Sequence, residues 1–205
     1  MSLDQPGDIL MKICGIRTVE HAELAAEHGA DAIGLVLAQG SPRRLTLEQA
    51  RAIHDAVPEG IEAVGVFRNN PIEQVMRFPG RWVQIHGDED EQFINRLDHR
   101  VIRGFGFDRE QLARWDACEK VEYLLVDSAE AGSGEGFDHE ALADCMADLS
   151  TPVIIAGGLH PGNVREALRC PRPTGVDVSS GVESEPGTKE PALIRAFCKA
   201  VRDPD

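Results

Sequence analysis

Short apolar runs recur along the chain, and each carries hydrophobic residues at successive positions instead of at alternate ones. A parallel strand that is buried on both faces gives this pattern, whereas a strand with one solvent-exposed face alternates apolar and polar residues. The pattern therefore predicts eight buried strands: Ile9–Cys14, Ala32–Leu37, Ala63–Phe67, Trp82–Ile85, Val101–Gly104, Tyr123–Val126, Val153–Ala156 and Gly175–Val178.

The segments between these runs have apolar residues at helical spacing. In one of them Leu47, Ala50 and Ile53 form a single apolar stripe, and Thr46 before them suits a helix N-cap. Proline is favoured in a first helical turn, where Pro71, Pro161 and Pro191 stand. The predicted helices are Thr18–His28, Thr46–Val57, Pro71–Phe78, Glu91–Leu97, Asp108–Trp115, Asp138–Leu149, Pro161–Leu168 and Glu190–Val201.

Strands that alternate with helices, with no linker or repeat between them, predict one α/β domain. Eight such pairs favour a (βα)8 barrel, the TIM-barrel fold. A doubly wound open sheet is the alternative, because alternation alone does not show that the sheet closes. We expect residues 9–205 to form this domain. Residues 1–8 are predicted to be an N-terminal extension that is disordered or was added by cloning.

The charge of the chain limits its partners. It has 21 Lys and Arg against 35 Asp and Glu, a formal net charge of -14. This balance argues against binding to nucleic acid or to an anionic membrane. No apolar run approaches the roughly 20 residues that span a bilayer, and the N-terminus does not resemble a signal peptide. An anionic ligand would have to be held by local groups, against the field of the whole protein.

The cysteines are five in number and scattered: Cys14, Cys118, Cys145, Cys170 and Cys198. No CxxC pair is present, so the sequence contains neither a zinc knuckle nor a thioredoxin-like motif. Reduced thiols in a cytoplasmic protein are the simplest interpretation. We expect no metal site.

Polar residues and glycines gather where the predicted strands end. In a (βα)8 barrel these positions carry the functional groups. Six of the eight strands end in this way, and scattered surface polarity would not select strand ends so consistently. The candidates are Cys14, Arg43, His86, Asp127, Gly157, Gly158, Asp177, Ser179 and Ser180.

The loops after the last two strands are the clearest of these candidates. Glycine lets backbone amides approach a ligand, and a helix N-terminus offers unpaired N–H groups to an anion. The loops after strands seven and eight form the usual phosphate site of such barrels. Two plain tight turns would also need glycine, but the pair Gly157-Gly158 together with Ser179-Ser180 favours phosphate binding.

Each remaining candidate has a structural alternative. Cys14 could be a small buried hydrophobic residue, and Asp127 could cap the following loop. His86 could simply orient a loop, which is the role we slightly favour from the residues alone. Arg43 suits a carboxylate clamp, because a guanidinium matches a carboxylate with two parallel hydrogen bonds. Its neighbour Arg44 is expected to be the solvent-exposed arginine of the pair.

Eight blocks in order carry a family resemblance from about Met11 to Phe197: MKICGI, GLVLAQGSPRRL, VGVFRN, VQIHGDE, LLVDS, GSGEGFD, IIAGGLHPGNV and GVDVSSGVESEPGTKE. In order and spacing they resemble the signature blocks of phosphoribosylanthranilate isomerases of tryptophan biosynthesis. KICGI near the start and GVDVSSGVE near the end are specific to that family when they occur together.

The resemblance implies an Amadori rearrangement of N-(5-phosphoribosyl)anthranilate to 1-(2-carboxyphenylamino)-1-deoxyribulose 5-phosphate, without metal or organic cofactor. By position, Cys14 resembles the general base and Asp127 the general acid. Arg43 resembles the arginine that holds the anthranilate carboxylate, and His86 and Asp177 resemble further substrate contacts. Gly157, Gly158, Ser179 and Ser180 fall in the phosphate loops. The expected partner is a small phosphosugar, and the expected state is a monomer or a homodimer.

The residue types suit this chemistry. Opening the furanose ring needs an acid that still holds its proton, and an aspartic acid, whose ordinary pKa is about 3.9, does so only where burial or a negative neighbour raises it. A thiolate can then remove the hydrogen from the adjacent sugar carbon. A free thiol has a pKa of about 8.5, so the site must lower it or work with a small reactive fraction.

Several positions depart from the family pattern without touching the presumed acid or base: Arg68, Glu135, His139, His160 and Glu190. Glu135 replaces a lysine and puts in doubt any contribution of its loop to anion binding. A related sugar isomerase of the histidine pathway is one rival function, but it has an aspartate where this chain has Cys14. A non-catalytic phosphosugar-binding barrel is the second rival, and it would need neither acid nor base.

Overall fold

Eight parallel strands close into a barrel in the computed structural model, which describes residues 3, 9–127, 139–169 and 173–203. Each strand pairs with the next one along the chain, and β8 pairs with β1 through partners such as Met11 and Val176. This last pairing confirms the barrel and excludes the open sheet. The strands are β1 Leu10–Cys14, β2 Ala32–Val36, β3 Glu62–Phe67, β4 Trp82–Ile85, β5 Arg100–Gly106, β6 Val121–Asp127, β7 Val153–Ala156 and β8 Gly175–Val178.

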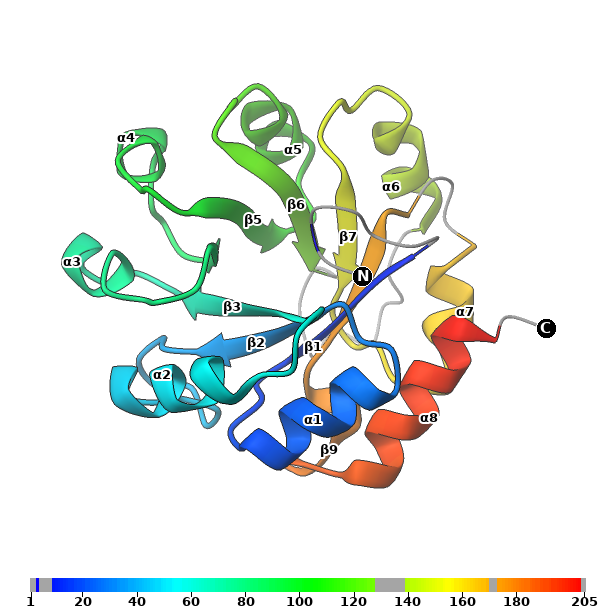
Figure 1. Cartoon of the computed structure of the whole chain (residues 1–205). Helices are drawn as coiled ribbons and strands as arrows, with labels where there is room; N and C mark the ends of the chain where they lie inside the picture. Colours follow the sequence, from blue (N-terminus) through cyan, green and yellow to red (C-terminus); the bar gives the residue numbers. More distant parts are fainter. Residues whose placement is uncertain (1–2, 4–8, 128–138, 170–172, 204–205) are drawn as a thin grey trace.

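The helices surround the barrel, with α1 and α8 side by side over β1 (Figure 1). They are α1 Val19–Glu27, α2 Leu47–Ala56, α3 Ile72–Val75, α4 Glu91–Asn95, α5 Arg109–Asp116, α6 His139–Met146, α7 Val164–Ala167 and α8 Pro191–Arg202. Thr46 caps α2 through a reciprocal pair of hydrogen bonds with Gln49, as its position in the sequence predicts. Among the described residues no helix has the length and apolar character that crossing a membrane requires.

Several helices are shorter than predicted, and α3 and α7 differ most in proportion to their length. Pro71 has extended backbone angles, so α3 begins one residue later, and Pro79 disfavours helical geometry at Phe78. Pro161 lies before α7 instead of inside it, and Asn163 is the N-cap. Proline marked the neighbourhood of both helix starts correctly, but not their first residues.

Side chains alternate between the two faces of each strand and so form separate layers. Met11 and Ile13 of β1 face outward and pack in the large cluster between the sheet and the helices. Leu10 faces inward, where it packs with Trp82 and Ile154 near the end at which the strands begin. The inner layer at the other end is small, and Cys14 belongs to it together with Val36, Ala38 and Val66.

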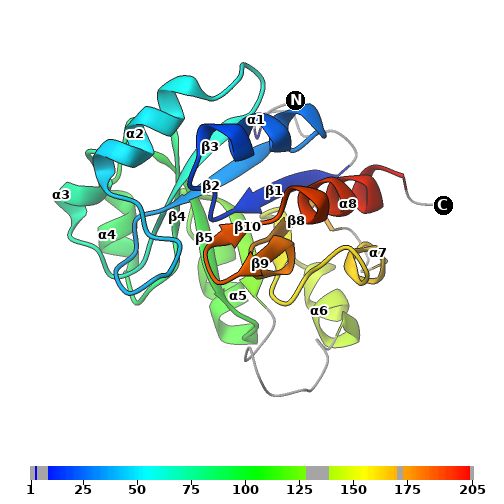
Figure 2. The ribbon, with the colours of Figure 1, turned by 90° about the horizontal axis from the view of Figure 1, so that it is seen from below.

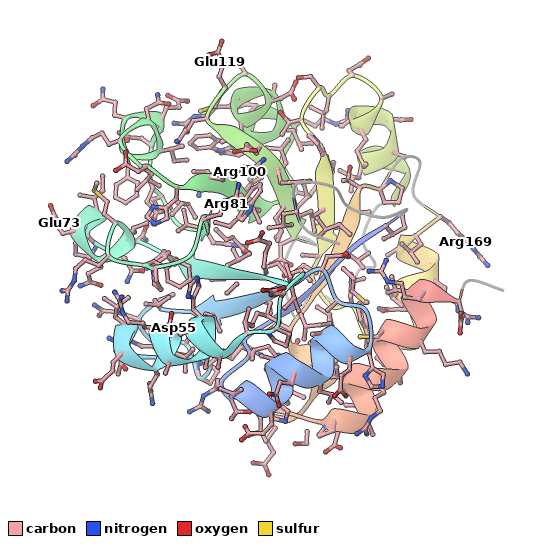
Figure 3. The ribbon with its side chains drawn as sticks, in the orientation of Figure 1. Asp55, Glu73, Arg81, Arg100, Glu119 and Arg169 are labelled. Atoms are coloured by element: carbon pink, nitrogen blue, oxygen red, sulfur yellow. The ribbon has the colours of Figure 1, made fainter. Side chains whose placement is uncertain are left out.

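Leu3 closes the end of the barrel at which the strands begin. It is 1% exposed and packs in the inner layer there, and its carbonyl oxygen accepts a hydrogen bond from the Tyr123 hydroxyl at 2.9 Å. The rest of the segment 1–8 lies outside the described residues, so the disorder expected for it stays a prediction. Figure 3 shows Arg81 and Arg100 near the centre of this view, where β4 and β5 begin, and Glu73, Glu119 and Arg169 at the periphery.

A short hairpin after β8 was not predicted from the sequence. It follows the 3-10 helix η1 Ser180–Val182 and pairs β9 Glu183–Glu185 with β10 Thr188–Lys189. Figure 2 shows it beside the tip of β1. Gly187 at its turn has a φ of 86°, and an added Cβ would lie 2.6 Å from the carbonyl oxygen of Pro42. Glycine therefore lets the hairpin pack against the loop after β2.

Candidate active site

Five of the nine candidate residues face into the barrel because they occupy alternate positions at the ends of four strands. Side chains two residues apart on a strand point to the same face, and the last two such positions on each strand open toward the loops. The pairs are Lys12 and Cys14 on β1, Gln84 and His86 at β4, Leu125 and Asp127 on β6, and Asp177 and Ser179 at β8.

All nine residues predicted from the sequence line one continuous hollow at this end of the barrel. One lobe, of about 450 Å³, is lined by Cys14, Arg43 and Asp127 among others. The neighbouring lobe, of about 460 Å³, adds Gly157, Gly158 and Ser180. The two lobes share five residues: Arg43, His86, Asp127, Asp177 and Ser179.

Cys14 lies against a buried ion pair that the sequence reasoning missed. Lys12 is fully buried, and its Nζ lies 2.8 Å from Oδ1 of Asp177. Burial works to lower the pKa of Lys12, but attraction to Asp177 and Cys14 raises it above its ordinary value, so Lys12 is charged at neutral pH. A lysine two residues before Cys14 in an apolar run was the available signal, because a buried charge needs a partner.

The thiol of Cys14 is hard to ionise. Burial raises its pKa, and the positive charge of Lys12 opposes that effect without cancelling it, so the pKa lies above its ordinary value. A raised pKa leaves only a small fraction of this thiol as thiolate at neutral pH. Lys12 keeps this fraction larger than burial alone would allow.

His86 is neutral and faces Asp127. Burial is the main cause that lowers its pKa, to about 4, and the charges of Arg103 and Lys12 add to the effect. Its Nδ1 lies 3.1 Å from the Gln84 amide nitrogen; with that amide donating, the ring carries its proton on Nε2. His86 Nε2 lies 3.9 Å from Oδ2 of Asp127, so the two groups are neighbours with no direct hydrogen bond.

Arg43 is paired with Glu183. Its Nε and Nη2 donate to the two carboxylate oxygens of Glu183, each at 2.7 Å. Burial works to raise the pKa of Glu183, but hydrogen bonds from Arg43 and Lys189 outweigh it and lower the pKa to about 2. Arg43 still lines both lobes of the hollow. The Nη1/Nη2 edge of its guanidinium is the edge left for a ligand carboxylate.

The loops after β7 and β8 have the open backbone that an anion site needs. Gly157 and Gly158 have φ angles of 86° and 61°, and an added Cβ at Gly158 would meet no atom within 4 Å. Within the described ranges, the amide N–H groups of these two glycines donate no hydrogen bond. At Gly181 an added Cβ would lie 1.8 Å from the carbonyl oxygen of Leu159, so only glycine lets the loops after β7 and β8 approach each other this closely.

Ser179 has an unsatisfied hydroxyl at the junction of the two lobes. Its Oγ is buried and finds no hydrogen-bond partner in the described part of the chain. A buried polar atom without a partner is rare, and at the wall of a hollow it suits a group that contacts a ligand. The hydroxyl therefore belongs with the backbone groups of the loops after β7 and β8.

Four further residues belong to the site although sequence reasoning gave them no role: Lys12, Gln84, Glu183 and Lys189. Glu183 and Lys189 lie in a block that carried the family resemblance, but only the folded hairpin brings them to Arg43. Glu135 and the His139 side chain lie outside the described residues, so the doubt about that loop stays open. In the described ranges no three His, Cys, Asp or Glu side chains are grouped so as to hold a metal ion.

The arrangement suits proton transfer on an anionic ligand with two charged ends. A thiol and a carboxyl group line one lobe, a guanidinium edge lies beside them, and the backbone amides of Gly157 and Gly158 line the other lobe. The net positive charge of Arg43, Glu183 and Lys189 supplies a local attraction that the net charge of -14 does not.

Comparison with known proteins gives one consistent match. The family model for N-(5'phosphoribosyl)anthranilate (PRA) isomerase matches residues 11–200. The N-(5'-phosphoribosyl)anthranilate isomerase of Geotalea uraniireducens is 42% identical over 198 residues, which cover 94% of this chain and 98% of that protein.

Solved structures agree with this match. The phosphoribosyl anthranilate isomerase of Thermus thermophilus superposes with a TM-score of 0.82 at 37% identity, over 95% of this chain and 98% of that one. Another phosphoribosyl anthranilate isomerase was solved in complex with reduced 1-(o-carboxyphenylamino)-1-deoxyribulose 5-phosphate. It superposes with a TM-score of 0.81 at 32% identity, over 95% of this chain and 98% of that one.

Proposed function

The chain belongs to the N-(5'-phosphoribosyl)anthranilate isomerase family, and from that premise we propose how its own residues carry the reaction. As a member it is an aldose–ketose isomerase of tryptophan biosynthesis. We propose that Cys14 is the general base and Asp127 the general acid in the conversion of N-(5-phosphoribosyl)anthranilate. The observation that carries these roles is that both side chains line one lobe of the hollow, with Arg43 beside them.

Asp127 starts the reaction by giving its proton to the furanose ring oxygen. The bond between that oxygen and C1 breaks, and the nitrogen lone pair forms a C1–N double bond, so the ring opens to an iminium ion. Asp127 ends as a carboxylate, and His86 stands 3.9 Å from it with a neutral ring. A neutral imidazole with its proton on Nε2 can donate a hydrogen bond to this carboxylate or to a sugar hydroxyl.

Cys14 then removes the hydrogen from C2 as a thiolate. The positive iminium withdraws electrons from that carbon, so its hydrogen leaves as a proton, and an enamine with a C1–C2 double bond forms. The Cys14 thiol then gives this proton to C1 and the Asp127 carboxylate accepts the C2 hydroxyl proton, which gives the ketone and restores both groups. The product has the same atoms as the substrate, and no electron acceptor is needed. Lys12, held by Asp177, stabilises the thiolate through its charge.

Binding divides between the two lobes. The phosphate lies at the loops after β7 and β8, where Gly157, Gly158 and Ser180 line the hollow and the Ser179 hydroxyl has no partner among the described residues. The anthranilate carboxylate meets the free edge of Arg43. Asp177, held by Lys12, faces the sugar between them. We also propose a cytoplasmic location and a monomer or homodimer, which sedimentation of the purified chain distinguishes.

Turnover of freshly prepared N-(5-phosphoribosyl)anthranilate tests the function. Substrate and product are isomers, so ¹³C NMR is the suitable readout: the anomeric carbon signal should disappear and a ketone carbon should appear. Turnover only of the aminoaldose isomerised in the histidine pathway would assign the chain to that rival function. Binding of the phosphosugar without any turnover would identify a non-catalytic barrel.

A further inference from the structure

The carboxylate of Glu183 is the most heavily bonded group at the active site. Its side chain is 3% exposed. It accepts hydrogen bonds from Arg43 Nε and Nη2 at 2.7 Å each, from Lys189 Nζ at 2.8 Å and from the Gly187 amide at 3.2 Å. Four donors on one buried carboxylate fix it in a single position, because charge-assisted hydrogen bonds are short and directional.

Lys189 links this carboxylate to the phosphate loop. The Lys189 side chain is 1% exposed, and its Nζ has a second acceptor, the carbonyl oxygen of Ser179, at 2.8 Å. A continuous path therefore runs from Arg43 through Glu183 and Lys189 to the loop after β8. The path joins the two ends of the hollow that the substrate's two anionic groups would occupy.

The geometry of Arg43 depends on this partner. Its aliphatic stem packs on Gly15, where an added Cβ would lie 2.5 Å from Arg43 Cδ, so this packing contact reaches the stem and the guanidinium lies beyond it. Its Nε edge is fully used by Glu183, which turns the Nη1/Nη2 edge toward the hollow. Without Glu183 the guanidinium could rotate about the terminal side-chain torsions of Arg43, and its orientation would no longer be fixed before the ligand binds.

We propose that Glu183 is the positioning residue that orients Arg43 for the substrate's carboxylate. The inference rests on the proposed function, because it takes Arg43 as the carboxylate contact. Glu183 touches no substrate atom in this account: both of its oxygens are occupied by the chain's own donors. Its effect on binding passes through Arg43 and should be absent where Arg43 is absent.

Two stable ligands test the inference by calorimetry: reduced 1-(o-carboxyphenylamino)-1-deoxyribulose 5-phosphate and the same molecule without its carboxylate. Glu183→Gln should raise the dissociation constant of the carboxylated ligand by roughly tenfold to a hundredfold, the range for a lost charged hydrogen bond. The ligand without the carboxylate should bind almost as tightly as before. Glu185→Gln, an exposed glutamate on the same strand, is the matched control and should change neither value.

A double-mutant cycle shows whether Glu183 acts through Arg43. Arg43→Ala with Glu183→Gln should bind the carboxylated ligand no more weakly than Arg43→Ala alone. Should the glutamine variant fail to fold, Glu183→Asp keeps the buried charge beside Lys189. It shortens the side chain by one methylene, so it should lose the same ligand discrimination to a smaller degree.

Three results would overturn the inference. The first is that the Glu183→Gln variant binds both ligands with wild-type affinity. The second is that it loses affinity for both ligands equally. The third is that Glu183→Gln lowers the affinity for the carboxylated ligand further when it is added to Arg43→Ala. If Arg43→Ala itself keeps the discrimination between the two ligands, the carboxylate contact in the proposed function is wrong and the inference falls with it. Turnover by the wild type is a separate readout and tests the reaction independently.

Discussion

Replacing Gly34 with alanine should displace the thiol of Cys14 without touching any group that binds substrate. Gly34 of β2 lies directly beside Cys14 of β1 in the sheet. An added Cβ there would lie 2.6 Å from Cys14 Sγ and 3.0 Å from its Cα. Both distances are shorter than van der Waals contact allows, so Cys14 and its strand must move.

The size of the effect follows from that overlap. An ordinary contact begins near 3.4 Å, so the sulfur must shift by roughly 1 Å, and a misplacement of that size at a reacting group costs about 10²-fold in rate. This corresponds to about 2.7 kcal/mol in the barrier. The strain should also lower the free energy of unfolding by about 1–3 kcal/mol, the usual cost of an overpacked core position.

The assay is steady-state turnover together with thermal unfolding. Gly34→Ala should lower kcat about 10²-fold and leave KM almost unchanged, because Arg43 and the phosphate loops keep their places. Gly106→Ala is the matched control: Gly106 lines the same hollow, and an added Cβ there meets no atom within 4 Å. A Gly34→Ala enzyme with wild-type kcat would refute the claim that the position of Cys14 controls the chemical step.

Three further outcomes are expected. Arg43→Ala should raise KM by the equivalent of roughly 1.5–3 kcal/mol, whereas Arg44→Ala at the exposed neighbour should not; the reverse would move the carboxylate contact to Arg44. Because burial raises the pKa of Cys14, kcat/KM should rise with pH through the alkaline range, and a plateau already reached near pH 7 would contradict a base whose pKa is raised. Inorganic phosphate should inhibit competitively, and Gly158→Val should weaken that inhibition by filling the space at a φ of 61°; unchanged inhibition would place the phosphate elsewhere.

The strands and the ends of the strands could be predicted from the sequence because one physical rule controls both. Strands buried on two faces are apolar throughout, so a polar residue marks where the barrel opens. Cys14 and Asp127 are the last residues of β1 and β6, and the predicted strands stopped at or beside both. Closure of the sheet was inferred from the number of strands, and the pairing of β8 with β1 confirms it.

The partners of these residues could not be predicted, because they come from distant parts of the chain. Arg43 and Glu183 are 140 positions apart, and Lys12 and Asp177 are 165 apart. A buried partner for Lys12 could have been predicted, because a lysine in a strand buried on both faces requires a buried acceptor. The hairpin that carries Glu183 has strands of only three and two residues, too short for any periodicity to indicate.

The most direct test of the account is the kcat of Cys14→Ala with N-(5-phosphoribosyl)anthranilate, measured beside Cys118→Ala. The account predicts that Cys14→Ala loses roughly 10²–10⁴-fold in kcat, the usual contribution of a general base, while its unfolding temperature stays close to that of the wild type. Cys118→Ala should keep full activity, because Cys118 lies after α5 and lines neither lobe of the hollow. Turnover by Cys14→Ala at the wild-type rate would contradict the central claim that this thiol removes the proton.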